Sequence, residues 1–157
     1  MKSFSKFKKQ IDNLFVSELK MEFCCYSYPM RSQRGSTSIP RFCVKIGKEI
    51  IWDCPKDFKI KGEDIYMWSN YNGICDLVRE YIDTPVDKLL SMKFKNDVWK
   101  CINNYHLENM IERIEIKYRL TEIFKAADRR LGKSKLIDFA KKVNNPVVDL
   151  IIKKRFK

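Results

Sequence analysis

The feature that most constrains the fold is a short run in which polar and apolar residues alternate strictly. In residues 41–46 the odd-numbered positions are Arg, Cys and Lys, and the even-numbered positions are Phe, Val and Ile. This period of two places the apolar side chains on one face of a β-strand. Gly47 and Lys48 separate the run from a second apolar stretch at residues 49–52, and glycine at the first position of a two-residue loop suits a type II′ turn. The sequence therefore predicts an antiparallel hairpin at residues 41–52.

The segments before the hairpin predict a helix and one more strand. A helix is expected from Ser5 to Leu19 because apolar residues recur at three- and four-residue spacing. These residues are Phe4, Phe7, Ile11 and Leu14. The aromatic-rich residues 21–28 are short enough for a strand, in which the adjacent Cys24 and Cys25 would point to opposite faces. Residues 29–40, with Pro, Gly, Ser and Arg, are predicted to form a loop.

From residue 73 onwards the apolar spacing becomes helical. A first helix is expected to end before Thr84, and its inward-facing residues are Ile74, Leu77, Val78 and Tyr81. Thr84 is expected to cap a new turn, with Pro85 at the first helical position and Asp87 placed to bond back to the cap. The inward-facing residues of that turn are expected to be Val86, Leu89 and Leu90.

Three further signals divide the last third of the chain. Helical spacing continues from Leu107 to Leu131, and Gly132 is expected to end that helix. Ser134 is expected to cap a helix that runs to about Val143, and Asn145–Pro146 gives a cap-and-proline signal before the last helix. The expected fold is α+β: an N-terminal helix, a small antiparallel sheet and a helical C-terminal half. One domain is expected over residues 1–157, with the sheet in residues 1–55 and the helical part in residues 73–157.

The charge of the chain is uneven. The formal net charge is +12, from 32 Lys and Arg against 20 Asp and Glu. Residues 1–10 contribute +4 and residues 126–157 contribute +7, so the middle of the chain is nearly neutral. A concentrated basic surface attracts acidic proteins, phosphate-bearing polymers or anionic lipid, whereas lysines on solvated helix faces serve solubility. Both interpretations stay open at this point.

Targeting signals and metal signatures are not found in the sequence. The N-terminal stretch has no apolar core of a secretory signal, and no run of about 18 apolar residues could cross a membrane. A cytoplasmic protein without membrane association is therefore expected. Six cysteines are present and none forms a C-x-x-C pair, so we expect reduced, buried thiols and neither a metal site nor a cofactor.

Residues 126–136, with the sequence AADRRLGKSKL, hold the most distinctive cluster of charge. Its candidate binding residues are Asp128, Arg129, Arg130, Lys133 and Lys135. Guanidinium groups near helix ends can bind a phosphate or a carboxylate. The structural alternative is that the cations offset the partial negative charge of a helix C-terminus while Asp128 pairs locally.

Two other features could contact a partner. The loop at residues 31–38 carries Arg31 and Arg34, which could bind a phosphate or an acidic group, although an ordinary hairpin connection explains it as well. Aromatic residues on the predicted sheet could stack on single-stranded bases or pack in the core. These aromatic residues are Phe23, Tyr26, Tyr28, Phe42 and Trp52.

Catalytic signatures are missing from the sequence. Gly132-Lys133-Ser134 resembles the end of a phosphate-binding loop, but position 127 is alanine where that motif requires glycine, and helical spacing precedes it. His106 is the single histidine, and nothing marks a cysteine partner as activated. The sequence therefore argues against an enzyme.

Four segments resemble a family of small uncharacterised bacterial proteins that is named after a Shigella locus. They are residues 4–10 (FSKFKKQ), Tyr28 with its arginine-containing loop, residues 41–53 and residues 127–136. Members of that family end with an Asp-Arg-Arg-Val/Ile-Gly-Lys-Arg-Arg-Leu motif, in which this chain has Ser134 and Lys135 instead of two arginines. The resemblance brings no activity. It implies a cytosolic bacterial accessory protein whose signature is Asp128, Arg129, Arg130, Gly132 and Lys133.

The leading expectation is a non-enzymatic interaction protein that docks an acidic partner protein, with an immunity or antitoxin-like role as one version. The alternative is nucleic-acid binding through the basic ends of the chain, for which affinity would fall steeply with salt. A hydrolase or nuclease would need a cleft in which Asp128 or Glu122 converges with Arg129 or Lys133. No small-molecule cofactor is expected in any of these cases.

Overall fold

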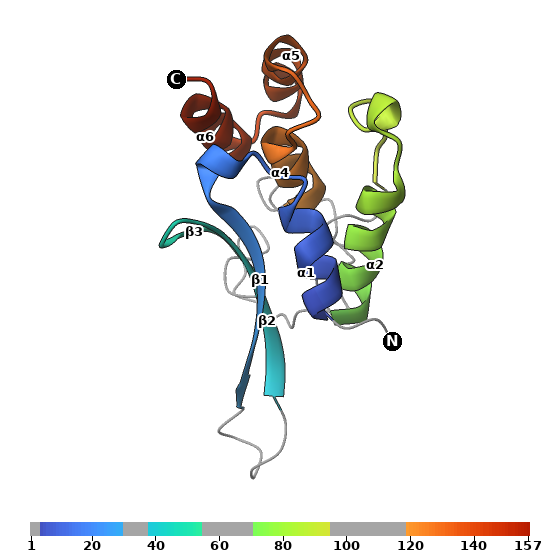
Figure 1. Ribbon diagram of the computed structural model, residues 1–157, viewed down its shortest axis with the longest axis vertical. Coiled ribbons are helices and arrows are strands. Elements are labelled where there is room, and N and C mark those ends of the chain that lie inside the picture. The colour runs from blue at the N-terminus through green and yellow to red at the C-terminus, as the bar shows by residue number, and fades with distance from the viewer. Residues whose placement is uncertain (1–3, 30–37, 55–70, 95–118) are drawn as a thin grey trace, which may run out of the picture.

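A three-stranded antiparallel sheet in the order β1-β2-β3 lies beside a group of helices in the computed structural model of the protein (Figure 1). The structure describes residues 4–29, 38–54, 71–94 and 119–157. The elements in chain order are α1 (Phe4–Asp12), η1 (Ser17–Leu19), β1 (Met21–Pro29), β2 (Ser38–Ile46), β3 (Glu49–Cys54), α2 (Tyr71–Asp83), η2 (Val86–Lys88), α4 (Leu120–Ala127), α5 (Lys133–Val143) and α6 (Pro146–Arg155). The expected α+β fold class is confirmed.

The hairpin of β2 and β3 matches the sequence prediction. Gly47 has a φ of 60°, whereas Lys48 is not among the described residues with positive φ, which is the type II′ pattern. A bulge between Val44 and Lys45 shifts the pairing by one residue. A bulge locally increases the right-handed twist of the strands that it joins.

The sheet has one apolar and one polar face. Phe23 lies opposite Val44, and Cys25 opposite Phe42, on the face that packs against the helices. Cys24 lies opposite Cys43 on the other face, so the two adjacent cysteines face opposite sides of the sheet, as predicted.

The core forms where α1 and α4 pack on the apolar face of the sheet. The ring of Phe23 lies 5.5 Å from that of Phe4 on α1 and 5.5 Å from that of Phe124 on α4, between ring centroids. The Phe124 ring also lies 5.3 Å from that of Tyr81 on α2. The aromatic residues Phe23, Phe42 and Trp52 are buried, so core packing is their role, whereas Tyr26 is 45% exposed.

The first helix is shorter than predicted. α1 ends at Asp12 instead of Leu19, although Leu14 continues the apolar spacing. The Asp12 carboxylate accepts hydrogen bonds from the Phe23 backbone N–H (2.9 Å) and from Lys8 Nζ (2.8 Å), which fixes the helix end against β1. The chain then extends to pair with residues near Asp128, and this long-range pairing replaces further helical turns.

The helix boundaries around Gly132 also differ from the prediction. α4 ends at Ala127, because Asp128 adopts an extended conformation with ψ of 117°. Gly132 does not stop a helix; it lies at the N-cap of α5, and Ser134 is inside the first turn of α5 rather than at its cap. The predicted end near Val143 is confirmed. The last helix also begins as predicted, since the Asn145 side chain accepts a hydrogen bond from the Val147 N–H.

The turn after α2 does not contain the predicted capping box. α2 ends before Thr84 as expected, but the Thr84 hydroxyl donates back to the Glu80 carbonyl (2.7 Å) and caps nothing ahead of it. Val86, expected to face inward, is 40% exposed, while Leu89 is buried.

Other boundary predictions are wrong or fall outside the described residues. β1 runs to Pro29 and β2 begins at Ser38, so strand replaces both ends of the loop predicted at residues 29–40. α2 begins at Tyr71, two residues before the helical spacing was expected to start. The helix expected at residues 107–118 lies outside the described residues. Among the described helices, none is long and apolar enough to cross a membrane.

Candidate binding site at the end of helix α4

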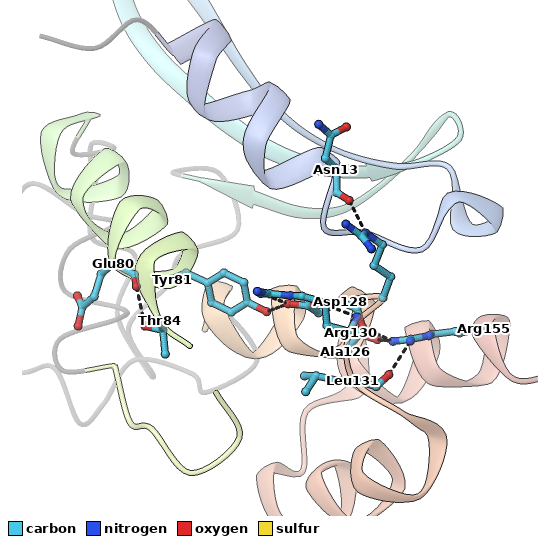
Figure 2. A network of polar contacts seen from close by, with 10 residues as sticks. Asn13, Glu80, Tyr81, Thr84, Ala126, Asp128, Arg130, Leu131 and Arg155 are labelled. Atoms are coloured by element: carbon cyan, nitrogen blue, oxygen red, sulfur yellow. Dashed lines mark hydrogen bonds and ion pairs between the residues drawn. The ribbon is translucent and has the colours of Figure 1, made fainter. Parts of the chain in front are cut away.

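The candidate site is the segment of residues 128–132 that connects α4 to α5. Asp128 is the first residue after α4 and its side chain is completely buried. A buried carboxylate is costly unless its oxygens accept hydrogen bonds from several donors. The donors that surround the Asp128 carboxylate therefore decide whether this segment is stable (Figure 2).

The Asp128 carboxylate accepts hydrogen bonds from Arg130 in the same segment and from Tyr81 on α2. Arg130 donates from Nε to Oδ1 (2.9 Å) and from Nη2 to Oδ2 (2.8 Å), a bidentate pair. The Arg130 backbone N–H also donates to Oδ1 (3.0 Å). From α2, the Tyr81 hydroxyl donates to Oδ2 (2.8 Å). Both oxygens of the carboxylate are thus occupied by protein donors.

Arg155, near the end of α6, holds the carbonyl groups at the end of α4. Its guanidinium donates to the carbonyls of Ala126 (3.0 Å), Asp128 (2.9 Å) and Leu131 (2.7 Å). The last carbonyls of a helix have no partner within the helix. A cation at this position both satisfies them and offsets the partial negative charge of the helix end.

The N-terminal segment after α1 pairs with the same residues. Phe15 and Asp128 form an antiparallel bridge, and the Val16 N–H donates to the Ala127 carbonyl (2.9 Å). Arg129 completes the pairing by donating its backbone N–H to the Leu14 carbonyl (2.7 Å) and its Nε to the Asn13 carbonyl (2.9 Å). Chain segments that are far apart in sequence therefore meet at the end of α4.

Burial and the contacts within this network shift the pKa values of Arg130, Tyr81 and Arg155. The hydrogen bond to Asp128 raises the pKa of Arg130, despite its partial burial. Burial, followed by the nearby Asp128 carboxylate, raises the pKa of Tyr81 well above its usual value. Burial lowers the pKa of Arg155. Tyr81 therefore keeps its proton at neutral pH and acts here as a hydrogen-bond donor.

Exposed lysines lie on α5, on α6 and two residues after the end of α6. We call them the C-terminal lysine group: Lys133, Lys135, Lys141, Lys142, Lys153, Lys154 and Lys157. None of them has an ion pair within the described part of the chain. The two helices pack against each other and lie together at one end of the molecule (Figure 1).

Two partly exposed apolar side chains lie among these lysines. Ile137 and Leu150 are half-buried and do not belong to the core cluster. Ile137 is one helical turn from Lys133 and from Lys141, and Leu150 is one turn from Lys154. Each helix thus carries a half-buried apolar side chain one turn from a lysine.

The model of the SF0329 protein family matches residues 3–156 of this chain. The chain belongs to that family. No curated protein and no solved structure matches it significantly. The expected resemblance to a small uncharacterised family is thereby supported at the level of the whole chain.

The structure divides the predicted site residues of this SF0329 family member into three groups. Asp128 and Arg130 are joined in the buried network, as the structural alternative predicted. Arg129, Lys133 and Lys135 are exposed, and Arg129 also contacts the N-terminal segment. Arg31 and Arg34 lie outside the described residues. Asp128 and Arg130 are therefore held in the network, while the exposed Arg129, Lys133 and Lys135 remain candidate binding residues.

Two members of the network were not predicted for this role. Tyr81 was expected only as a core residue, and Arg155 only as part of a basic surface. Their partners lie 47 and 27 residues away from them in the chain, so no local pattern identifies the contacts. Among the described residues, no group of three or more His, Cys, Asp or Glu side chains could hold a metal ion.

Proposed function

We propose that this SF0329 family protein is a non-enzymatic interaction protein that docks an acidic partner protein through α5 and α6. The observation that carries the proposal is the C-terminal lysine group, seven exposed cations without an ion pair in the described part of the chain. The exposed acids of α5 and α6 are Asp138 and Asp149. This end of the molecule therefore carries an uncompensated positive charge, which attracts a surface of opposite charge.

The kind of cation and its surroundings favour a protein partner over a nucleic acid. Arginine guanidinium groups bind phosphates bidentately. Here the guanidinium of Arg130 binds Asp128 and that of Arg155 binds backbone carbonyls, so both are engaged within the protein. Apolar side chains such as Ile137 and Leu150 among the lysines resemble the mixed composition of a protein interface.

The alternative of one nucleic-acid surface requires both basic ends of the chain to act together. In Figure 1 the first turn of α1 points away from the end of the molecule where α5 and α6 lie. In addition, Lys8 on α1 is paired with Asp12 and donates to the Phe23 carbonyl. A continuous basic track from α1 to α6 is therefore not favoured.

A catalytic role for the motif is not favoured either. Asp128 is fully buried with both oxygens bonded, which leaves it unable to reach a substrate. Glu122 is buried and accepts a hydrogen bond from Asn145 (3.4 Å). An immunity or antitoxin-like role in the cytoplasm is the most concrete version of the docking proposal.

Two matched charge-reversal variants test the proposal. The first carries Lys133→Glu, Lys141→Glu and Lys154→Glu on α5 and α6. The second carries Lys6→Glu, Lys9→Glu and Lys48→Glu, which are exposed residues on α1 and the hairpin turn. Both change the net charge equally, so only the position of the charge differs. Circular dichroism first establishes that each variant is folded.

The full-length protein is used to capture partners from the cells that make it, and a captured acidic protein is purified and titrated by calorimetry. We expect a one-to-one complex whose affinity falls about tenfold or more in the α5–α6 variant and stays nearly unchanged in the other. Labelled DNA and RNA are titrated in parallel at several salt concentrations. Tight nucleic-acid binding with a steep salt dependence, or equal effects of both variants, would contradict the proposal.

A further inference from the structure

We propose that Cys24 and Cys43 form a disulfide bond between β1 and β2 when the protein reacts with hydrogen peroxide. This modification site is independent of the docking surface, because it lies on the polar face of the sheet rather than on α5 and α6. Both cysteines are free thiols in the structure.

The strand register brings the two cysteines directly opposite each other. Cys24 on β1 pairs with Cys43 on β2 in the antiparallel ladder. Directly opposite residues in such a ladder have Cα atoms about 4.5 or 5.5 Å apart, depending on the pair type. Both values lie within the range of about 4.4–6.8 Å that a disulfide bond spans. The register therefore places the two cysteines within the Cα separation that a disulfide bond requires.

Polar groups on both sides of Cys24 favour it as the thiol that reacts first. The Lys8 ammonium donates to Cys24 Sγ at 3.9 Å, and the Cys24 thiol faces the Glu22 carboxylate at 3.9 Å. A nearby ammonium can donate a proton to the oxygen that leaves the peroxide, and a nearby carboxylate can accept the thiol proton as the sulfur attacks. Cys24 is thus placed between a cation and a base.

Cys43 is suited to react second. Cys43 is 1% exposed and Cys24 is 6% exposed, so both are buried and Cys24 is the more accessible of the two. Burial, with the neighbouring Cys24, raises the pKa of the Cys43 thiol to about 11. It is therefore poor at attacking peroxide itself. It lies opposite Cys24, however, where it can attack a sulfur that has already been oxidised.

The reaction balances with one molecule of peroxide. Cys24 Sγ attacks a peroxide oxygen, the O–O bond breaks, and the proton from the thiol leaves with the departing hydroxide as water. The resulting sulfenic acid is attacked by Cys43 Sγ. The S–O bond breaks, the S–S bond forms, and the hydroxide leaves with the Cys43 proton as a second water. Two thiols are oxidised and one peroxide is reduced to two waters.

The neighbouring cysteines provide the contrast. Cys25 lies opposite Phe42 on the apolar face, and burial raises the pKa of its thiol to about 11. Cys75 on α2 is the cysteine that most affects Cys25, so a Cys25–Cys75 bond is the competing outcome. In the described structure, no lysine or carboxylate hydrogen bond to either thiol matches those at Cys24.

The test treats the folded full-length protein with hydrogen peroxide, blocks remaining thiols with N-ethylmaleimide, and analyses tryptic peptides by mass spectrometry. The expected product joins the peptide of residues 21–31 to the peptide of residues 42–45, which contains Cys43 as its single cysteine. Dithiothreitol should remove the link. Since the first peptide contains two cysteines, variants assign the bond: Cys24→Ser and Cys43→Ser should lose it, whereas Cys25→Ser should keep it.

A kinetic comparison tests the role assigned to Lys8. Lys8→Met should slow formation of the link about fivefold, the order expected when a unit charge near 4 Å is removed in a hydrated setting. Lys9→Met, at an exposed neighbouring position, should leave the rate unchanged. Thiols that stay reduced in excess peroxide, a Cys25–Cys75 link, or Cys24 oxidised to sulfinic acid without a link would each overturn the proposal.

Discussion

Asp128 shows how one residue can fix a junction between distant segments of a chain. Its carboxylate binds Arg130 and Tyr81, while its backbone carbonyl accepts from Arg155. Its backbone also forms the bridge to Phe15. The side chain is completely buried, so the balance between desolvation and pairing decides whether the junction is stable.

Removal of the Asp128 carboxylate should destabilise the fold strongly. We expect Asp128→Ala to lower the free energy of unfolding by about 3–5 kcal/mol, because Arg130 and the Tyr81 hydroxyl lose their acceptor in a buried setting. Urea denaturation followed by circular dichroism measures the effect.

Lys133→Ala is the control, since Lys133 belongs to the same motif but is exposed. Its effect should stay within about 0.5 kcal/mol. Similar losses for the two variants would show that the motif does not act through the buried network.

At the scale of single residues, contacts between neighbours in the chain could be predicted from the sequence, whereas contacts between distant residues could not. Asp128 and Arg130 are two residues apart, so local pairing follows from their spacing. The role of Tyr81 depends on how α2 packs against α4, and that of Arg155 depends on the position of α6. Neither arrangement is encoded in a local pattern, and the basic composition near residue 155 suggests a surface instead.

At the scale of the elements, boundaries set by local chemistry could be predicted and those set by tertiary contacts could not. Gly47 and Asn145 act through their own backbone or side chain, and both predictions hold. α1 and α4 end early, although Leu14 and Leu131 continue the helical spacing, because residues 13–16 and 127–129 bond to each other instead.

Gly47 and Gly132 have different roles and allow a direct test of this distinction. Gly47 has a φ of 60°, and a Cβ atom added there would meet no other atom within 4 Å, so only its backbone conformation resists a side chain. Gly47→Ala should therefore cost about 1–2 kcal/mol. Thermal unfolding of the purified variant provides the measurement.

Gly132→Ser is the matched variant at an N-cap with negative φ and open space around it. Serine is at least as good as glycine at such a position, so stability should be unchanged or slightly higher. A clear loss at Gly132 would show that this glycine has a role other than starting α5.

For the whole molecule, the ring of Phe124 joins the sheet and the helical part of the single domain that the sequence predicted. It contacts Phe15 from the N-terminal segment, Phe23 from the sheet and Tyr81 from α2. This shared core predicts that the sheet and the helices unfold together as one domain.

Coincident unfolding transitions would verify this. In a variant with Trp68→Phe and Trp99→Phe, the fluorescence of the buried Trp52 reports on the sheet, and far-UV circular dichroism reports on the helices. The two urea midpoints should agree. Phe124→Leu should shift both by the same amount, corresponding to about 1–3 kcal/mol. Separate midpoints, or a shift in one signal alone, would indicate two independent units.

The pairing between the N-terminal segment and the end of α4 has a consequence during synthesis. Asn13 and Arg129 are 116 residues apart, so a ribosome that adds about 5–20 residues per second needs roughly 6–23 s to make the second partner after the first. Throughout that interval Phe15 lacks the ring of Phe124 that later covers it. The nascent chain therefore carries an apolar side chain that stays uncovered by its partner ring until residue 124 has been made.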